Sequence, residues 1–168
     1  MISKSTDASL RAGFEANMDE SENHIARLDR VFALHGVAAG GVNCPAIDGI
    51  LEEADELAGD IADKGGLDAA LIAAAQAVEH YEITRYGTLV AWAKKLGRND
   101  CAALLQATLD EEKAADHKLS VLALQGINQK AAWGPVDYGG AVCTPPLRLT
   151  WRGTDLTGIN AVLGLDWL

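Results

Sequence analysis

The sequence is poor in basic side chains and in long apolar runs, and each shortage excludes a class of protein. Only 14 lysines and arginines stand against 24 aspartates and glutamates, which gives a formal net charge of -10. Because such a surface repels phosphate groups, we expect neither nucleic acid nor an anionic membrane surface as a partner. Apolar runs are far shorter than the roughly 20 residues of a membrane-spanning helix, and residues 1–20 lack a signal-peptide core.

Cysteine is also scarce, and its spacing excludes the common zinc and redox motifs. Cys44, Cys101 and Cys143 are odd in number, lie far apart and lack the Cys-x-x-Cys spacing. They indicate ordinary intracellular thiols. Together with the missing signal sequence, they predict a soluble cytoplasmic protein.

What the chain has instead is helical periodicity, with apolar residues recurring at three- and four-residue steps over most of residues 8–130. The residues that begin or end helices divide this region into four predicted helices: Gly36, Pro45, Gly97, Asn99 and Gly126. The third helix is expected to begin after Gly66. Short loops favour antiparallel neighbours. The pattern therefore predicts an all-α protein with one helical domain.

Residues 131–168 differ sharply in composition from this domain. They hold three of the four tryptophans among many glycines and prolines, and they show no helical period. Leu147 to Trp151 alternates like a strand, but one short strand without a partner is not a stable element. We expect an irregular tail.

Acidic side chains interrupt helix faces that ought to be apolar. Two lie on the inner stripe of the third predicted helix, and the fourth and first helices each carry a pair spaced one turn apart. Buried carboxylates are costly and repel one another, and a bound cation offsets both effects. Iron and manganese prefer carboxylates with one or two imidazoles. The pattern predicts a metal site formed from six residues: Glu20, His24, Glu79, Glu82, Glu112 and Asp116.

Other interpretations of these residues stay open. Glu111 and Glu112 precede Lys113, so surface ion pairs could account for the acidic spacing. His80 points away from the seam and is expected to pack near the site or support it. It could instead accept phosphate in a phosphotransfer bundle, although Glu79 and its neighbours would oppose a phosphoryl group. Three further side chains are expected at the surface or in the core: His35, His117 and Tyr86.

Three strings of sequence resemble the YciE/YciF-type ferritin-like proteins over about residues 8–130. They are ANMDESENHIARLDRVF, EHYE with the YGTL that follows it, and EEKAAD, in that order. The resemblance implies a ferritin-like bundle with a di-iron or di-manganese centre, of a kind found in bacterial stress proteins. The six residues above would be its ligands, and residues 45–63 would be the family's extra connecting helix.

The sequence departs from the family at both ends. The family begins with another core helix that carries a ligand glutamate, whereas only MISKSTDA precedes the first helix here, and the tail has no counterpart. Either the tail or a second chain could cover the apolar surface that this helix would bury, and we expect a homodimer. The leading hypothesis is a two-metal oxidoreductase that reacts with peroxide or dioxygen. The alternative is a metal-free, non-catalytic oligomeric bundle with a structural role, or a degenerate product.

Overall fold

The computed structural model describes residues 1–132, and the predicted tail from residue 133 onward lies outside the described residues. Every regular element within residues 1–132 is helical, which confirms the predicted fold class. None of the helices in this range is long and apolar enough to cross a membrane. The elements are η1 (Ile2–Lys4), α1 (Ala8–His35), α2 (Pro45–Asp60), α3 (Lys64–Lys95), α4 (Asn99–Leu122), η2 (Ala123–Ile127) and α5 (Asn128–Ala132).

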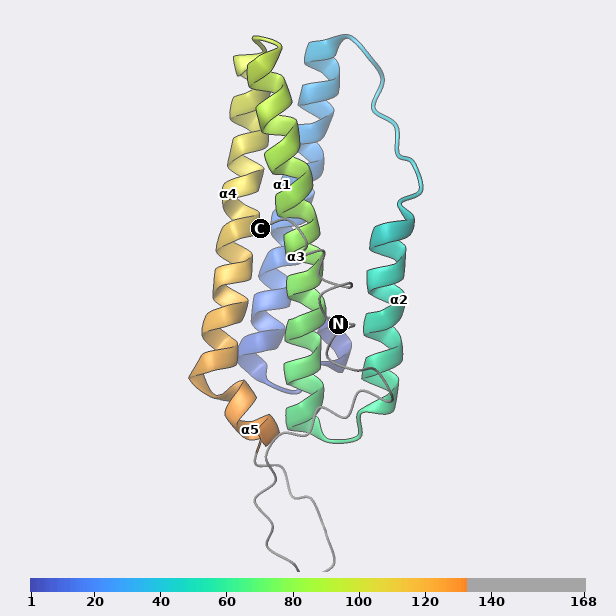
Figure 1. The fold of residues 1–168 in the computed structure, drawn as a ribbon, viewed down its shortest axis with the longest axis vertical. Coiled ribbons are helices and arrows are strands. Elements are labelled where there is room, and N and C mark those ends of the chain that lie inside the picture. Colours follow the sequence, from blue (N-terminus) through green and yellow to red (C-terminus); the bar gives the residue numbers. More distant parts are fainter. Residues whose placement is uncertain (133–168) are drawn as a thin grey trace, which may run out of the picture. The chain divides into compact units, whose positions relative to one another are not determined.

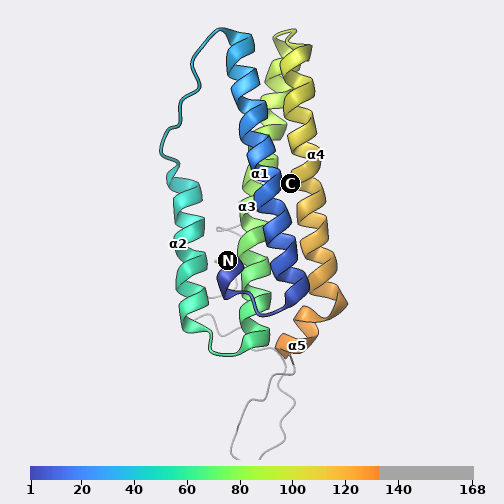
Figure 2. The same ribbon diagram turned by 180° about the vertical axis from the view of Figure 1, so that it is seen from behind.

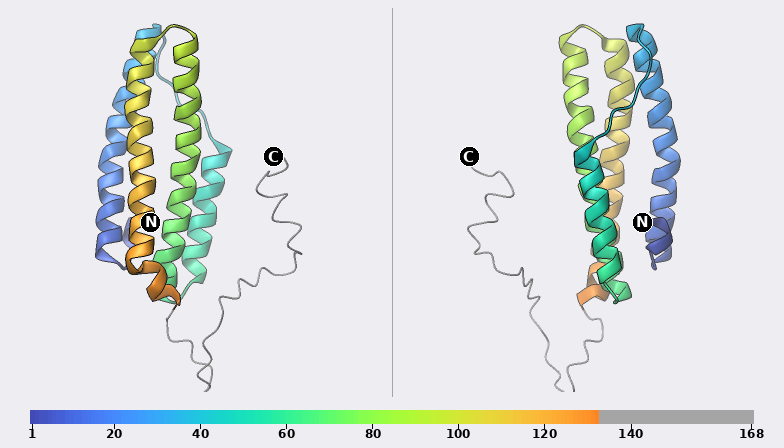
Figure 3. Two further views of the ribbon diagram at one scale, coloured as in Figure 1. Left: turned by 60° about the vertical axis from the view of Figure 1, so that its left-hand side comes forward. Right: turned by 90° about the vertical axis from the view of Figure 1, so that its right-hand side faces the viewer.

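Three long helices form the body of the structure (Figures 1 and 2). Helices α1 and α3 run in the same direction, and α4 runs antiparallel to both. Helix α4 packs against α1 on one side and against α3 on the other, as the left view of Figure 3 shows. The shorter α2 lies against the outer side of α3, where the extra connecting helix was expected.

The core consists of two apolar clusters with polar side chains between them along the helices. The first cluster gathers around the start of α1, the first half of α3 and the end of α4, and it includes Leu10, Leu71 and Leu119. The second surrounds the α3–α4 connection and includes Val90, Cys101 and Leu105. The buried polar residues of the intervening layer are His24, Glu79, Thr108 and Glu112. The candidate site therefore occupies a gap in the apolar core.

Most helix ends follow the sequence signals. Gly36 and Gly97 adopt left-handed backbone conformations, with φ of 68° and 71°, directly after α1 and α3. Glycine adopts this conformation without the steric cost that other residues incur. The predicted stops of the first and third helices are confirmed.

Two predicted boundaries were wrong. Helix α3 begins at Lys64, because the Asp63 carboxylate accepts a hydrogen bond from the N–H of Gly66 and so draws the glycines into its first turn. Asn99 is the first residue of α4 and not its cap, and Arg98 takes the cap position without a side-chain bond. Gly126 does interrupt the helix as predicted, because its φ of 156° is not helical and forms a kink, after which α5 begins.

Candidate metal centre

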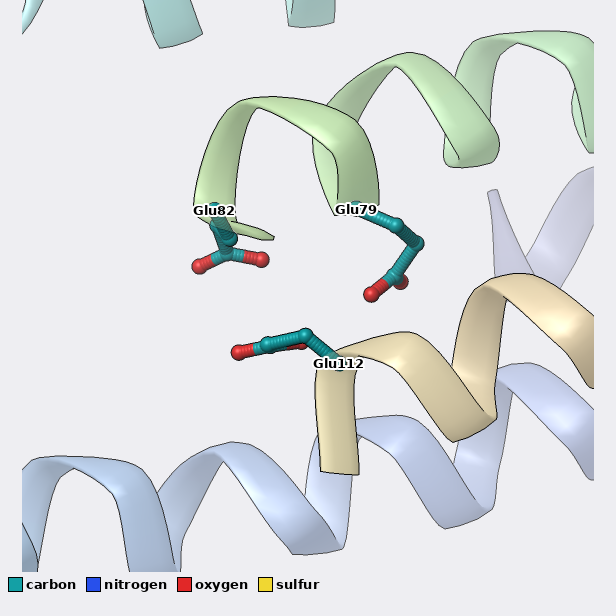
Figure 4. Close-up of side chains that lie close together, drawn as sticks. All are labelled: Glu79, Glu82 and Glu112. Atoms are coloured by element: carbon teal, nitrogen blue, oxygen red, sulfur yellow. The ribbon is translucent and has the colours of Figure 1, made fainter. Parts of the chain in front are cut away.

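Three glutamates converge in the layer between the two apolar clusters. Glu79 and Glu82 come from adjacent turns of α3 and Glu112 comes from α4 (Figure 4). One carboxylate oxygen from each lies within 4.8 Å of the other two. Glu79 is 2 % exposed and Glu112 is 1 % exposed, while Glu82 is half-buried. Helical periodicity produces this convergence, because residues three positions apart share a helix face.

His24 adds an imidazole from α1. Its Nδ1 lies 3.0 Å from Oε1 of Glu112, although the angles are not those of a hydrogen bond. The ring packs edge-on against Tyr86, with centroids 6.3 Å apart, and Tyr86 belongs to the neighbouring apolar cluster. All three long helices therefore contribute a side chain to this group of four, which we call the glutamate cluster: His24, Glu79, Glu82 and Glu112.

The cluster leaves buried oxygen atoms without partners. Oε1 of Glu79 accepts a hydrogen bond from the Asn17 amide at 2.9 Å. Its other oxygen, Oε2, has no hydrogen-bond partner among residues 1–132, and the same is true of Oε1 of Glu112. Unpaired buried carboxylate oxygens are unusual in folded proteins because they lose their hydration. Oxygen ligands gathered around a small space, together with one imidazole, fit a divalent iron or manganese ion.

Burial and mutual repulsion alter the acidity of the cluster. Burial, together with the negative charges of Glu82 and Glu79, raises the pKa of Glu112 to about 9. Burial also raises the pKa of Glu79 and that of Glu82, and the neighbouring Glu79 carboxylate adds to the effect on Glu82. In the metal-free protein, protons therefore reduce the negative charge that a cation would otherwise neutralise.

Two of the six predicted ligands lie beside the cluster and contact other groups. Glu20 lies 3.5 Å from the ammonium of Lys118. Asp116 accepts a hydrogen bond from the Gln76 amide at 2.8 Å and lies 3.1 Å from Nε2 of His80. Both carboxylates are close enough to Glu79 for their charges to raise its pKa. His80 is largely exposed and touches the site only through Asp116.

Glu111 is a neighbour of the cluster for which the sequence left a surface ion pair with Lys113 open as an alternative. It does form an ion pair, but with Arg27 of α1 and not with Lys113. The guanidinium of Arg27 holds the pKa of Glu111 below its usual range. The second oxygen of this carboxylate also contacts His24, so Glu111 joins α4 to the imidazole. The available signal was Arg27, which follows His24 by one turn on the same face of α1.

Two hollows border Glu79. A small cavity of about 30 Å³ is lined by Glu79, Glu20, Lys118 and apolar side chains, and it has room for about one water molecule. An open groove of about 560 Å³ runs between α1, α2 and α3, and its lining includes Phe14, Met18 and Glu79. The groove therefore borders the cluster at Glu79, whose side chain is buried in its wall.

Known proteins share both the sequence and the fold. A family model described as a domain of unknown function (DUF892) matches residues 1–132. Protein YciF of Escherichia coli strain K12 is 44 % identical over 123 residues, which are 73 % of this chain and 74 % of that protein.

Two solved structures agree with this result. The E. coli stress protein YciF superposes with a TM-score of 0.72 at 41 % identity, over 77 % of this chain and 82 % of that one. YcfI from Rhodopseudomonas palustris, provisionally described as a structural protein, superposes with a TM-score of 0.70 at 55 % identity, over 71 % and 76 % of the two chains. With an all-α bundle and this degree of identity, the chain belongs to the DUF892 family of YciF-like ferritin-fold proteins.

Proposed function

We propose that this protein binds iron or manganese through the glutamate cluster, as a ferritin-like protein of the bacterial stress response. The observation that carries the proposal is the meeting of Glu79, Glu82 and Glu112 within 4.8 Å in an otherwise apolar core. Keeping three carboxylates there has a large desolvation cost unless protons or cations neutralise them. The oxygen-rich ligand set favours iron or manganese over copper or zinc.

The full complement that we propose is two ions. The glutamate cluster would hold the first ion, and Glu20 and Asp116 would complete a second position beside Glu79. The bound metals would supply redox chemistry toward peroxide or dioxygen. The protein's own part is to hold the ligands. Asn17 orients Glu79, Glu112 gives up its proton on loading, and Tyr86 shields the imidazole from water.

The stress role and the location rest on similarity alone. E. coli YciF is described as a stress protein, and its identity to this chain supports the same role here. The acidic composition and the odd number of widely spaced cysteines favour the cytoplasm, which stays a prediction.

A metal-free bundle with a structural role is the second candidate. It is favoured by the contacts of Glu20 with Lys118 and of Asp116 with His80, which satisfy two of the predicted ligands without any ion. The provisional description of YcfI as a structural protein points the same way.

Metal loading separates the two candidates. Protein incubated with Mn²⁺, or with Fe²⁺ under anaerobic conditions, is desalted and analysed for metal by mass spectrometry. The proposal expects about one to two ions per chain and a higher melting temperature of the loaded protein. Glu82→Ala should lose both the bound metal and the rise in melting temperature. Glu53→Ala, at an exposed position of α2, is the matched control and should retain the wild-type metal content.

The opposite result supports the structural candidate. If the wild type retains neither metal and Glu82→Ala leaves the melting temperature unchanged in the presence of either ion, the metal proposal is wrong.

A further inference from the structure

His24 lies between two glutamates that meet its two ring nitrogens on opposite sides. Nδ1 lies 3.0 Å from Oε1 of Glu112, which is buried in the glutamate cluster. Nε2 lies 2.8 Å from Oε2 of Glu111, whose side chain is 35 % exposed. One nitrogen of the ring therefore faces the candidate metal centre, and the other faces the edge of the bundle.

Arg27 determines how Glu111 can interact with the ring. Its two terminal nitrogens donate to the two oxygens of Glu111, with a distance of 2.8 Å between Nη2 and Oε1. Nη1 also donates to the hydroxyl oxygen of Thr108 at 3.3 Å, which ties the guanidinium to α4 at a second point. A carboxylate held bidentately by arginine is an acceptor only. The contact with Nε2 therefore requires that this nitrogen carry the hydrogen.

The hydrogen on Nε2 decides which nitrogen is free to bind an ion. A neutral imidazole that donates from one nitrogen presents a lone pair on the other. In a neutral His24 ring that lone pair is on Nδ1, which lies 3.0 Å from the Oε1 atom of Glu112. Rotation of the ring would break the contact with Glu111 and would turn Nδ1 away from the cluster.

We infer that Glu111 is a positioning residue, braced by Arg27, that fixes the His24 ring so that Nδ1 is the nitrogen presented to a metal ion. The inference rests on the proposed function, because it assigns the ligand atom of that site. Residues that hold a metal-binding histidine in this way typically affect metal affinity by about 10- to 100-fold when they are replaced.

The first test uses the metal-free wild-type protein. Long-range ¹H–¹⁵N correlation spectra of the His24 ring distinguish its two neutral tautomers. The expected spectrum has the hydrogen on Nε2, and Glu111→Gln should shift the ring toward a mixture. A wild-type ring with its hydrogen on Nδ1 would overturn the inference. The wild-type spectrum alone decides this point, and it needs neither bound metal nor a folded variant.

The second test compares Mn²⁺ affinity in two neighbouring variants of α4. Glu111→Gln should weaken Mn²⁺ binding by about 10-fold or more. Asp110→Asn is the matched control, because it removes the same charge from the adjacent exposed residue, whose carboxylate accepts from Gln106. The control should remain within about 2-fold of the wild type, since distant surface charges are screened.

The outcomes separate the two proposals. Equal losses in both variants, or wild-type affinity in Glu111→Gln, would contradict the positioning role while leaving metal binding intact. If the wild type binds no Mn²⁺ but its ring carries the hydrogen on Nε2, the proposed function fails and the orientation of the ring by Glu111 stands.

Discussion

At the scale of single residues, Glu112 should control how the stability of the metal-free protein depends on pH. Its pKa rises from an ordinary value of 4.5 to about 9 on folding, so the folded state holds this proton more tightly than the unfolded chain does. Stability from this group is fully present below about pH 4.5 and is lost as pH rises toward 9. Glu112→Gln keeps the shape and removes the ionisation.

We expect metal-free Glu112→Gln to be more stable than the wild type at about pH 8.5, by about 1 kcal/mol or more, because wild-type Glu112 must take up on folding a proton that the unfolded chain has released. At about pH 5 the difference should be small or reversed. Urea melts of both proteins across this range measure it. Glu53→Gln, at an exposed position of α2, is the control and should follow the wild-type curve. A constant difference between Glu112→Gln and the wild type would contradict the expectation.

The sequence predicts which residues share the seam but does not determine their contacts. The helical period places Glu79, Glu82 and Glu112 on inner faces, and the structure brings them together with His24. Periodicity does not decide which of several charged groups a flexible side chain will contact. The sequence left a surface ion pair of Glu111 with Lys113 open, yet Arg27 from another helix is its partner.

At the scale of elements, the contact between α3 and α5 depends on a glycine. A Cβ added at Gly65 would lie 3.0 Å from the backbone carbon and oxygen of Lys130. Backbone atoms cannot move aside as the end of a side chain can. We expect Gly65→Ala to destabilise the protein by about 1 kcal/mol or more, since overpacking commonly costs that much. Thermal melts measure the change.

Gly87→Ala is the control on the same helix, because a Cβ at Gly87 meets nothing within 4 Å. In the interior of α3 this substitution should stabilise the protein by about 0.5–1 kcal/mol through helix propensity. If Gly65→Ala were equally stabilising, the close packing of α5 on α3 would be wrong.

Element ends were predictable where the backbone itself sets them. Gly36 and Gly97 end their helices because the left-handed conformation suits glycine. The start of α4 was mispredicted because Arg98 is held by tertiary contacts. Its guanidinium donates to the carbonyl oxygen of Leu34 and to Asp100, and the helix begins one residue earlier than a capping Asn99 would imply. Contacts of this kind join residues that are far apart in the sequence.

At the scale of the whole molecule, metal and protons should compete for the same layer of the core. The glutamate cluster lies between two apolar clusters, so neutralising its charge, with metal or with protons, supports the packing of both apolar clusters. Excess Mn²⁺ should therefore raise the melting temperature by several degrees at about pH 7.5, and by much less at about pH 5.5, where ligands hold their protons. Calorimetry at both pH values measures this. Mg²⁺ is the control ion and should have little effect.

The predicted homodimer can be tested on the exposed apolar side chains of α1. Met18 and Ile25 of α1 are 58 % and 61 % exposed, and Met18 borders the groove beside Glu79. Apolar side chains gathered beside a groove favour association with another surface. Light scattering after size-exclusion chromatography should give twice the mass of one chain. Because each chain carries a net charge of -10, added salt should strengthen the dimer by screening repulsion.

Ile25→Glu should shift this dimer toward the monomer, since it would place a desolvated charge in the contact. Leu124→Glu is the matched control, because Leu124 is 82 % exposed in the η2 turn, away from the groove. This control variant should keep the wild-type mass. A wild-type chain that stays monomeric at high salt and high concentration would contradict the homodimer. If both variants dissociate the dimer equally, the added charge and not the α1 surface would be responsible, and the contact would have to lie elsewhere.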